Sequence, residues 1–175
     1  MTPNSIFDVH LVLGYVAWLL AFSAYIWPRL KVMDAVAAQR AIATLHGFRF
    51  FGLVFILPGV VGTLPVTFAT VAAWGDFATG VLALAALLTI RMPQLFWLFV
   101  VAFNVAGMAD LLVDYYNAVR LGLADIAGQL GTTYAIPVLY VPILMITHVA
   151  SFILLARHLR NTGEAGLLPE PDFSR

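Results

Sequence analysis

The sequence predicts an all-α integral membrane protein: a single bundle of five transmembrane helices, with the N-terminus outside and the C-terminus cytoplasmic. The first observation is composition, because 62% of the 175 residues are hydrophobic and 10% are charged. Soluble domains have about 45–50% apolar and about 25% charged residues. The second observation is a series of long apolar stretches, and the third is an uneven distribution of basic residues between them. Together these indicate a chain whose solvent is lipid.

Five stretches are long enough to cross a hydrocarbon core, which needs about 20 apolar residues in a helix. They are residues 6–27, 40–62, 68–90, 94–120 and 132–159. The sequence has no internal repeat, so residues 1–160 are predicted to form one transmembrane domain. The polar residues 161–175 contain Pro and Gly and are predicted to form a flexible cytoplasmic tail.

The first span is predicted to end at Pro28, because proline has no N–H to continue the helical hydrogen bonds. Residues 35–47 are less apolar and are predicted to form an entry helix near the interface, which continues into the second span. Pro58 and Gly59 lie near the far end of that second span and predict a kink there.

The third span contains an interruption at Trp74-Gly75-Asp76. A helix that began at Asp76 and ended at Ile90 would be only about 21 Å long, which is short for a core of about 30 Å. Either the helix runs through Asp76 or residues 66–73 form a partly inserted segment, and we favour the continuous helix. Arg91-Met92-Pro93 then separates the third span from the fourth, and Pro137 and Pro142 fall in the first half of the fifth.

The orientation follows from the basic residues, which concentrate on the cytoplasmic side of membrane proteins. Arg29, Lys31 and Arg40 lie between the first two spans, and Arg91 lies between the third and fourth. Further basic residues follow the fifth span, whereas the opposite side has only Arg120 near a helix end. The protein is therefore expected to be a multi-pass protein of the cell membrane, the inner membrane in a bacterium.

The fourth span contains polar residues that a lipid-facing helix carries only at high cost. Asp110, Asp114 and Asn117 have the spacing i, i+4, i+7 and share one helix face, while Asn104 is displaced by about 120° from Asp110. A second interpretation of Asp114 and Asn117 is that both side chains are simply hydrated at the edge of the membrane. Asp110 lies a turn deeper, where a carboxylate costs about 2.5–3.5 kcal/mol to insert at a helix centre. We expect it to line a cavity, to form a hydrogen bond to His10 or Tyr134 on another helix, or to be protonated at neutral pH.

Three further polar residues are placed in the inner half of the membrane by the predicted topology. His46 and Arg49 are three residues apart on one face, and Arg49 and His148 fall at the same depth when counted from the helix ends. Arg49 either faces the interior or extends toward the cytoplasm. The candidate cavity residues are Arg49, Asn104, Asp110, His148, His46, Asp114, Asn117 and Tyr134.

These residues support three hypotheses of function. The first is a polar intramembrane cavity, lined by the second, fourth and fifth spans, that binds or conducts a small amphiphilic molecule or protons. The second is a membrane-embedded redox or acid–base enzyme that uses His46, His148 and Asp110, in which the two histidines hold haem or a metal. The third is a non-catalytic assembly component, a homo-oligomer included, that associates through the small residues Gly80, Ala83 and Ala86.

No cofactor or metal site is predicted by the favoured first hypothesis, and the lipid bilayer is the expected surrounding partner. The formal net charge is zero, so there is no basic field for a nucleic acid. The chain has no cysteine, which excludes thiolate metal sites and a cysteine nucleophile. Whether the protein is an enzyme is left open.

Overall fold

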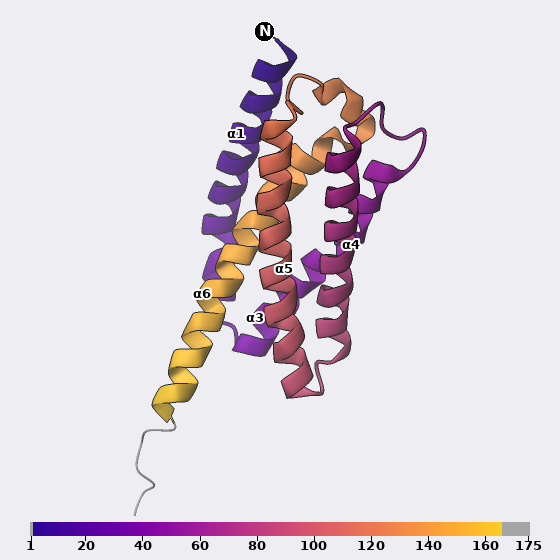
Figure 1. Ribbon diagram of the computed structural model, residues 1–175. Coiled ribbons are helices and arrows are strands. Elements are labelled where there is room, and N and C mark those ends of the chain that lie inside the picture. The colour runs from indigo at the N-terminus through magenta and orange to yellow at the C-terminus, as the bar shows by residue number, and fades with distance from the viewer. Residues whose placement is uncertain (1, 166–175) are drawn as a thin grey trace, which may run out of the picture.

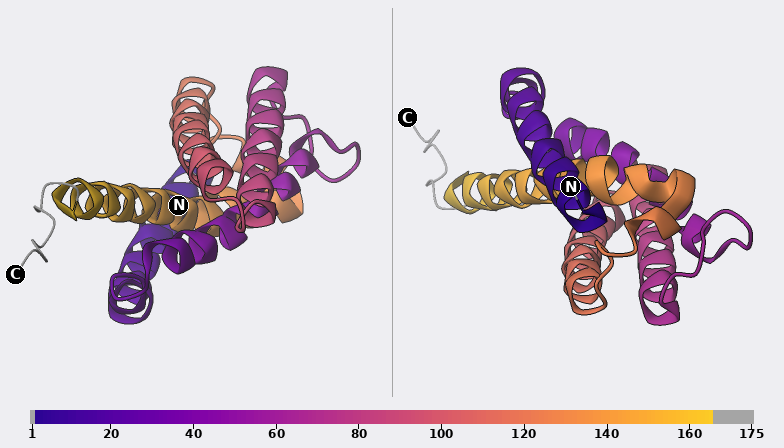
Figure 2. Two further views of the ribbon diagram at one scale, coloured as in Figure 1. Left: turned by 90° about the horizontal axis from the view of Figure 1, so that it is seen from below. Right: turned by 90° about the horizontal axis from the view of Figure 1, so that it is seen from above.

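The computed structural model describes residues 2–165, and every regular element in this range is a helix (Figure 1). In chain order the elements are α1 (Pro3–Ala21), η1 (Phe22–Ile26), α2 (Trp27–Leu30), α3 (Ala35–His46), η2 (Gly47–Ile56), α4 (Val66–Leu88), α5 (Pro93–Arg120), η3 (Ala127–Tyr134), η4 (Ile136–Tyr140) and α6 (Val141–Ala165). They form an elongated bundle in which α4 and α5 run side by side (Figures 1 and 2).

Four helices of the described chain are long and apolar enough to cross a membrane. They are Pro3–Leu30, Val66–Leu88, Pro93–Arg120 and Ile136–Thr162. The prediction of an all-helical bundle is therefore confirmed, with four helices of membrane-spanning length and composition among the described residues. The predicted second span, residues 40–62, is divided between α3 and η2 and is not one of the four.

Two of the long helices continue through a proline because a π turn precedes it. In the first helix the N–H of Trp27 donates to the carbonyl of Phe22, five residues back, and Pro28 follows. In the last helix the N–H of Val141 donates to Ile136, and Pro142 follows. A wider turn relieves the clash between a proline ring and the preceding turn. The expectation that Pro28 ends the first span was wrong, since the helix reaches Leu30.

The second segment begins as an α-helix and ends as a long 3₁₀-helix. Oδ1 of Asp34 caps α3 by accepting from the N–H of Ala37 at 2.9 Å. From Gly47 the chain continues as the ten-residue η2, and Leu57 is extended, with φ −82° and ψ 115°. The helix thus stops before Pro58 and Gly59, so these residues end it rather than kink it. Gly59 has a positive φ of 82°.

The three-residue repeat of a 3₁₀-helix explains which side chains of η2 are buried. Arg49, Gly52 and Phe55 are three residues apart, so at 3.0 residues per turn they share one face, and all three are buried. The remaining faces carry the exposed rings of Phe48, Phe50 and Phe51. One polar and glycine-bearing face therefore packs inside the bundle, and an aromatic surface lies outside.

Glycines allow η2 to lie directly against α4. A Cβ atom at Gly80 of α4 would be 2.9 Å from the backbone nitrogen of Phe50, and one at Gly52 would collide with the carboxylate of Asp76. Ala83 and Ala86 of α4 are fully buried among side chains of the same chain. The small residues considered above for association between copies thus pack within one chain.

The later elements differ from the predicted bounds mainly at the fifth span. α4 runs through Asp76 without a break, as the favoured alternative has it, and α5 follows the predicted span closely. Gly131 has a non-helical backbone (φ 55°, ψ −130°), so the long final helix starts at Ile136 rather than at residue 132. Residues 161–165 of the predicted tail extend α6, and residues 166–175 lie outside the described residues.

The apolar interior is divided into two cores with a polar layer between them. One core includes Phe96, Val100 and Phe103 of α5, and the other includes Phe68 and Ala72 of α4. At the level where α4 passes from one core to the other, α4, α5 and α6 carry buried polar residues. They are Asp76, Thr79, Asn104, Thr147 and His148. The fold thus encloses polar side chains at mid-length in the bundle.

The close contact between η2 and α4 can be tested with Gly80→Leu. The added side chain forces the two elements apart, and overpacking of this kind costs about 1–3 kcal/mol or more. We expect a lower unfolding midpoint in detergent than for Gly128→Leu, the matched control, because a Cβ atom at Gly128 meets no atom within 4 Å. Equal midpoints for the two variants would contradict the contact.

Candidate functional site

The guanidinium of Arg49 is the centre of the polar layer. Arg49 lies on η2 and is 0% exposed. Its Nε donates to Oδ1 of Asp76 at 2.6 Å, and its Nη2 donates to Oδ2 of Asp110 at 2.5 Å. Asp76 belongs to α4 and Asp110 to α5, so a single side chain connects three elements by charge-assisted hydrogen bonds.

The third nitrogen of the guanidinium faces α5 and α6. Nη1 of Arg49 lies 3.2 Å from the carbonyl oxygen of Gly107 and 3.3 Å from Nε2 of His148. A Cβ atom at Gly107 would be 2.6 Å from Nη1 of Arg49, Nε2 of His148 and Cγ2 of Thr79. A glycine is therefore required where the guanidinium passes α5.

A hydrogen-bond relay fixes the tautomer of His148. Nδ2 of Asn104 donates to the carbonyl of Val100 at 2.8 Å, which leaves Oδ1 of Asn104 to accept from Nδ1 of His148 at 3.0 Å. With its proton on Nδ1, His148 presents a bare Nε2 that accepts from Arg49. Asn104 thus lies on the other flank of the same cluster as Asp110.

The ring of His46 lies against that of His148, with the centroids 4.0 Å apart and the ring planes inclined by 43°. The hydroxyl of Thr147 donates to backbone carbonyls of its own helix, so Nε2 of His46 donates to this hydroxyl at 3.0 Å. Nδ1 of His46 is buried and has no hydrogen-bond partner among the described residues. Both ring nitrogens of His148 and Nε2 of His46 have hydrogen-bond partners. Among the four ring nitrogens of these two histidines, only Nδ1 of His46 lacks a partner in the described part of the chain.

The charges of the cluster do not balance when both carboxylates are ionised. One guanidinium faces Asp76 and Asp110, whose side chains are 8% and 9% exposed. Burial of an ion in low dielectric costs several kcal/mol, and a partner offsets this only when its geometry is good. Arg49 therefore neutralises one carboxylate, and the excess negative charge lies on the side of α4 and α5 away from the histidines.

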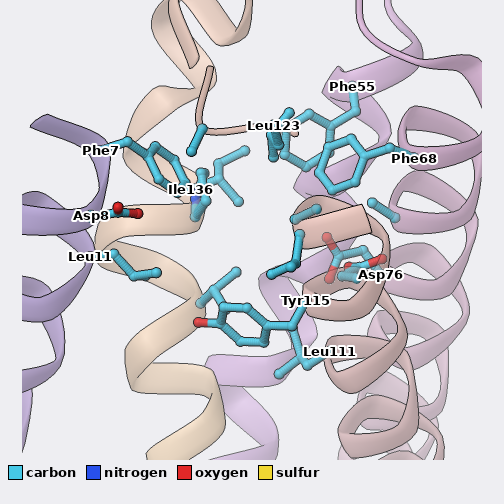
Figure 3. A pocket seen from close by; sticks show the side chains of 17 residues that line it. Phe7, Asp8, Leu11, Phe55, Phe68, Asp76, Leu111, Tyr115, Leu123 and Ile136 are labelled. Carbon is cyan, nitrogen blue, oxygen red and sulfur yellow. The ribbon is translucent and has the colours of Figure 1, made fainter. Parts of the chain in front are cut away.

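A pocket begins on this acidic side and leads toward the end of the bundle that carries the N-terminus (Figure 3). Its volume is about 130 Å³. Its walls come from α1, η2, α4, α5 and the start of the last helix, and most of the lining is apolar. The polar lining consists of Asp8, Asp76, Asp114 and Tyr115. Asp76 thus contacts both the Arg49 cluster and the pocket.

The sequence-predicted site residues divide into two groups. Arg49, Asn104, Asp110, His46 and His148 form the connected cluster described above, which is packed rather than open, and none of them lines the pocket. Asp114 lines the pocket, and one of its oxygens is buried without a partner among the described residues. Asn117 is buried at the same end of α5.

Tyr134 lies apart from the cluster. Its hydroxyl is 2.9 Å from Nδ1 of His10, near the N-terminal end of the bundle. His10 and Tyr134 therefore bond each other, and the expectation that one of them pairs with Asp110 was wrong. The pairing of Asp110 with Arg49 is the reason, since a buried cation takes the nearest carboxylates.

Two acidic residues of the pocket lining, Asp8 and Asp76, were not among the sequence-based candidates. Asp76 was considered only in deciding where the third helix begins, and Asp8 was given no role. A signal for Asp76 does exist, because a mid-span arginine needs a mid-span acid and the third span offers only this one. The cavity was expected between the second, fourth and fifth spans, whereas α1 and α4 also contribute to the walls of the pocket.

A family model matches residues 6–156 of this sequence. The chain belongs to the DUF8737 family. The description of that family is a domain of unknown function. The DUF8737 match includes the whole Arg49 cluster and every residue that lines the pocket. No curated protein and no solved structure matches the chain.

Removal of the central cation of this DUF8737 protein should strongly destabilise the bundle. Arg49→Gln leaves Asp76 and Asp110 buried without a counter-ion, and breaking a buried pair costs about 3–5 kcal/mol. We expect Arg40→Gln, at an exposed position, to change stability by less than about 0.5 kcal/mol. The free energy of unfolding in mixed detergent micelles measures both variants.

The charge of the cluster can be separated from its packing in the same assay. Replacing both carboxylates in the Arg49→Gln background, by Asp76→Asn and Asp110→Asn, should recover part of the lost stability because no unpaired charge is left. If Arg49→Gln is as stable as Arg40→Gln, the cluster does not carry this role.

Proposed function

We propose that this DUF8737 protein is a five-span protein of the cell membrane that binds a small amphiphilic molecule in the pocket between α1, α4 and α5. The observation that carries the proposal is the position of Asp76. Its carboxylate lines an otherwise apolar pocket and is held in place by Arg49 at 2.6 Å. Ligand sites typically combine apolar walls with a few fixed polar groups.

The size of the pocket limits the ligand to a small molecule. An engineered apolar cavity of about 150 Å³ accepts benzene. The pocket, at about 130 Å³, is slightly smaller but opens to the outside of the bundle. A benzyl-sized apolar group with a polar end therefore fits the volume and the polarity of the lining.

The fifth crossing in this proposal is the segment α3–η2. At 1.5 Å per residue the 12 residues of α3 are about 18 Å long, and at 2.0 Å per residue the 10 residues of η2 add about 20 Å. This exceeds a hydrocarbon core of about 30 Å. With the basic residues on the cytoplasmic side, the pocket opens to the outside.

Two alternatives keep a structural basis. A membrane-embedded redox enzyme would use the adjacent His46 and His148, in which Nδ1 of His46 has no partner among the described residues. That alternative requires a visible absorption band or stoichiometric metal in the purified protein. An assembly component would use the exposed aromatic face of η2 to contact another chain.

The topology can be tested with cysteines, since the natural chain has none. Gly128→Cys lies in η3, which is proposed to be outside, and Val32→Cys, at a position 78% exposed, lies in the loop proposed to be inside. We expect a membrane-impermeant maleimide to label Gly128→Cys on intact cells and Val32→Cys only after permeabilisation. The reverse pattern would overturn the orientation.

Occupancy of the pocket can be tested with Ala118→Cys, because Ala118 lines it one turn after Asp114. Only the thiolate reacts, so a thiol in contact with water reacts and a thiol in lipid does not. We expect methyl methanethiosulfonate to modify Ala118→Cys and benzyl alcohol to slow the reaction. The control is Val32→Cys, at an exposed position between α2 and α3 and outside the pocket lining, which should react without this protection. A rate at Ala118→Cys that benzyl alcohol leaves unchanged would contradict the binding function.

A further inference from the structure

We propose that the ligand of this pocket is a cation, a small amine with an apolar body, and that its ammonium group binds at Asp114 and Asp76. The inference rests on the proposed function of the same pocket. It follows from which charges line the pocket, which charges are already neutralised, and what forms the walls.

Two of the three carboxylates of the pocket lining, those of Asp8 and Asp114, have no cation beside them. Asp8, Asp76 and Asp114 line the pocket, whereas Arg and Lys side chains are absent from the lining residues. Among the described residues, no basic side chain forms an ion pair with Asp8 or Asp114. Oδ1 of Asp114 is buried and lacks a hydrogen-bond partner in the same part of the chain. A bound ammonium group would supply both the charge and the missing donor.

Arg49 cannot supply that charge to a ligand. It is fully buried, and it contacts the far side of Asp76 rather than the pocket. Four of its five N–H groups have partners on Asp76, Asp110, Gly107 and His148. An anionic ligand would therefore meet three carboxylates and no available cation. Arg49 acts as a positioning residue that holds Asp76 toward the pocket.

The other basic residue at this end of α5 points elsewhere. The guanidinium of Arg120 lies 5.9 Å from the ring centroid of Tyr116, and neither residue lines the pocket. Arg120 is also exposed, so water screens its charge. The field inside the pocket is thus set by the carboxylates.

Aromatic rings form much of the wall around these carboxylates. Phe7, Phe55, Phe68 and Tyr115 line the pocket, and Figure 3 shows the three phenylalanines above the level of Asp76 and Tyr115 below it. The faces of such rings attract cations, and their area favours an apolar body. An amine with an apolar body has both a positive charge for the carboxylates and apolar surface for the rings. A neutral or anionic molecule of the same size has only the apolar surface.

The test uses Ala118→Cys and three probes of similar size: benzylammonium, benzyl alcohol and benzoate. Each probe is titrated while methyl methanethiosulfonate, which is uncharged, modifies the cysteine in the detergent-solubilised full-length protein. We expect benzylammonium to protect at a concentration roughly tenfold or more below that of benzyl alcohol, because one charge-assisted hydrogen bond contributes about 1.5–3 kcal/mol. Benzoate is expected to protect least.

Charge variants identify the residues that are responsible. Asp114→Asn in the Ala118→Cys background should reduce the preference for benzylammonium over benzyl alcohol to about threefold or less, while benzyl alcohol still protects. Asp8→Asn, at the exposed mouth, should lower the preference less, and it serves as the second variant if Asp114→Asn does not fold. Asp125→Asn is the matched control, since Asp125 lies at the same end, bonds Asn4 and does not line the pocket.

The outcomes separate this inference from the function on which it rests. Equal protection by benzylammonium and benzyl alcohol, or a preference that Asp114→Asn and Asp8→Asn leave unchanged, overturns the cation and retains the pocket. Better protection by benzoate than by benzylammonium also overturns it and assigns the ligand to Arg49. No protection by any probe overturns the proposed binding function as well.

Discussion

The burial of one guanidinium is the constraint on which the rest of this structure depends. Arg49 is removed from water at mid-length in an apolar bundle, where an unpaired charge is several kcal/mol too costly. It is stabilised by donating to Asp76, Asp110 and the carbonyl of Gly107. These partners lie on α4 and α5, so both helices must pack against η2 at the same level.

The requirements of this cluster extend into the packing around it. Glycine is needed where α5 passes the guanidinium and where η2 meets α4, because a Cβ atom would occupy the space of the ion pair or of the backbone. The apolar core is consequently divided in two, with the polar layer between. Asp76 of this layer accepts from Arg49 through one carboxylate oxygen and also lines the pocket.

Sequence reasoning reached the parts of this site that follow from helical spacing and depth. Counting from the helix ends placed Arg49 and His148 at one level, and the side-chain nitrogens are 3.3 Å apart. It did not assign Asp76 to the site, because Trp74-Gly75-Asp76 was considered only as an interruption of the third span. Neither the contact between the rings of His46 and His148 nor the 3₁₀ geometry of η2 was predicted, since both depend on contacts with distant segments. The function, the five crossings and the orientation remain proposals.

The helix type of η2 also determines its length and the direction of its side chains. As a 3₁₀-helix its ten residues extend about 20 Å, and as an α-helix the same residues would extend about 15 Å. In the α form, Phe55 would turn by about 120° relative to Arg49, away from the face that both now share. Phe55 lines the pocket, whereas Arg49 belongs to the ion cluster. A change of η2 from a 3₁₀-helix to an α-helix would therefore shorten the segment by about 5 Å. If Arg49 kept its place in the ion cluster, Phe55 would move and the pocket would change shape.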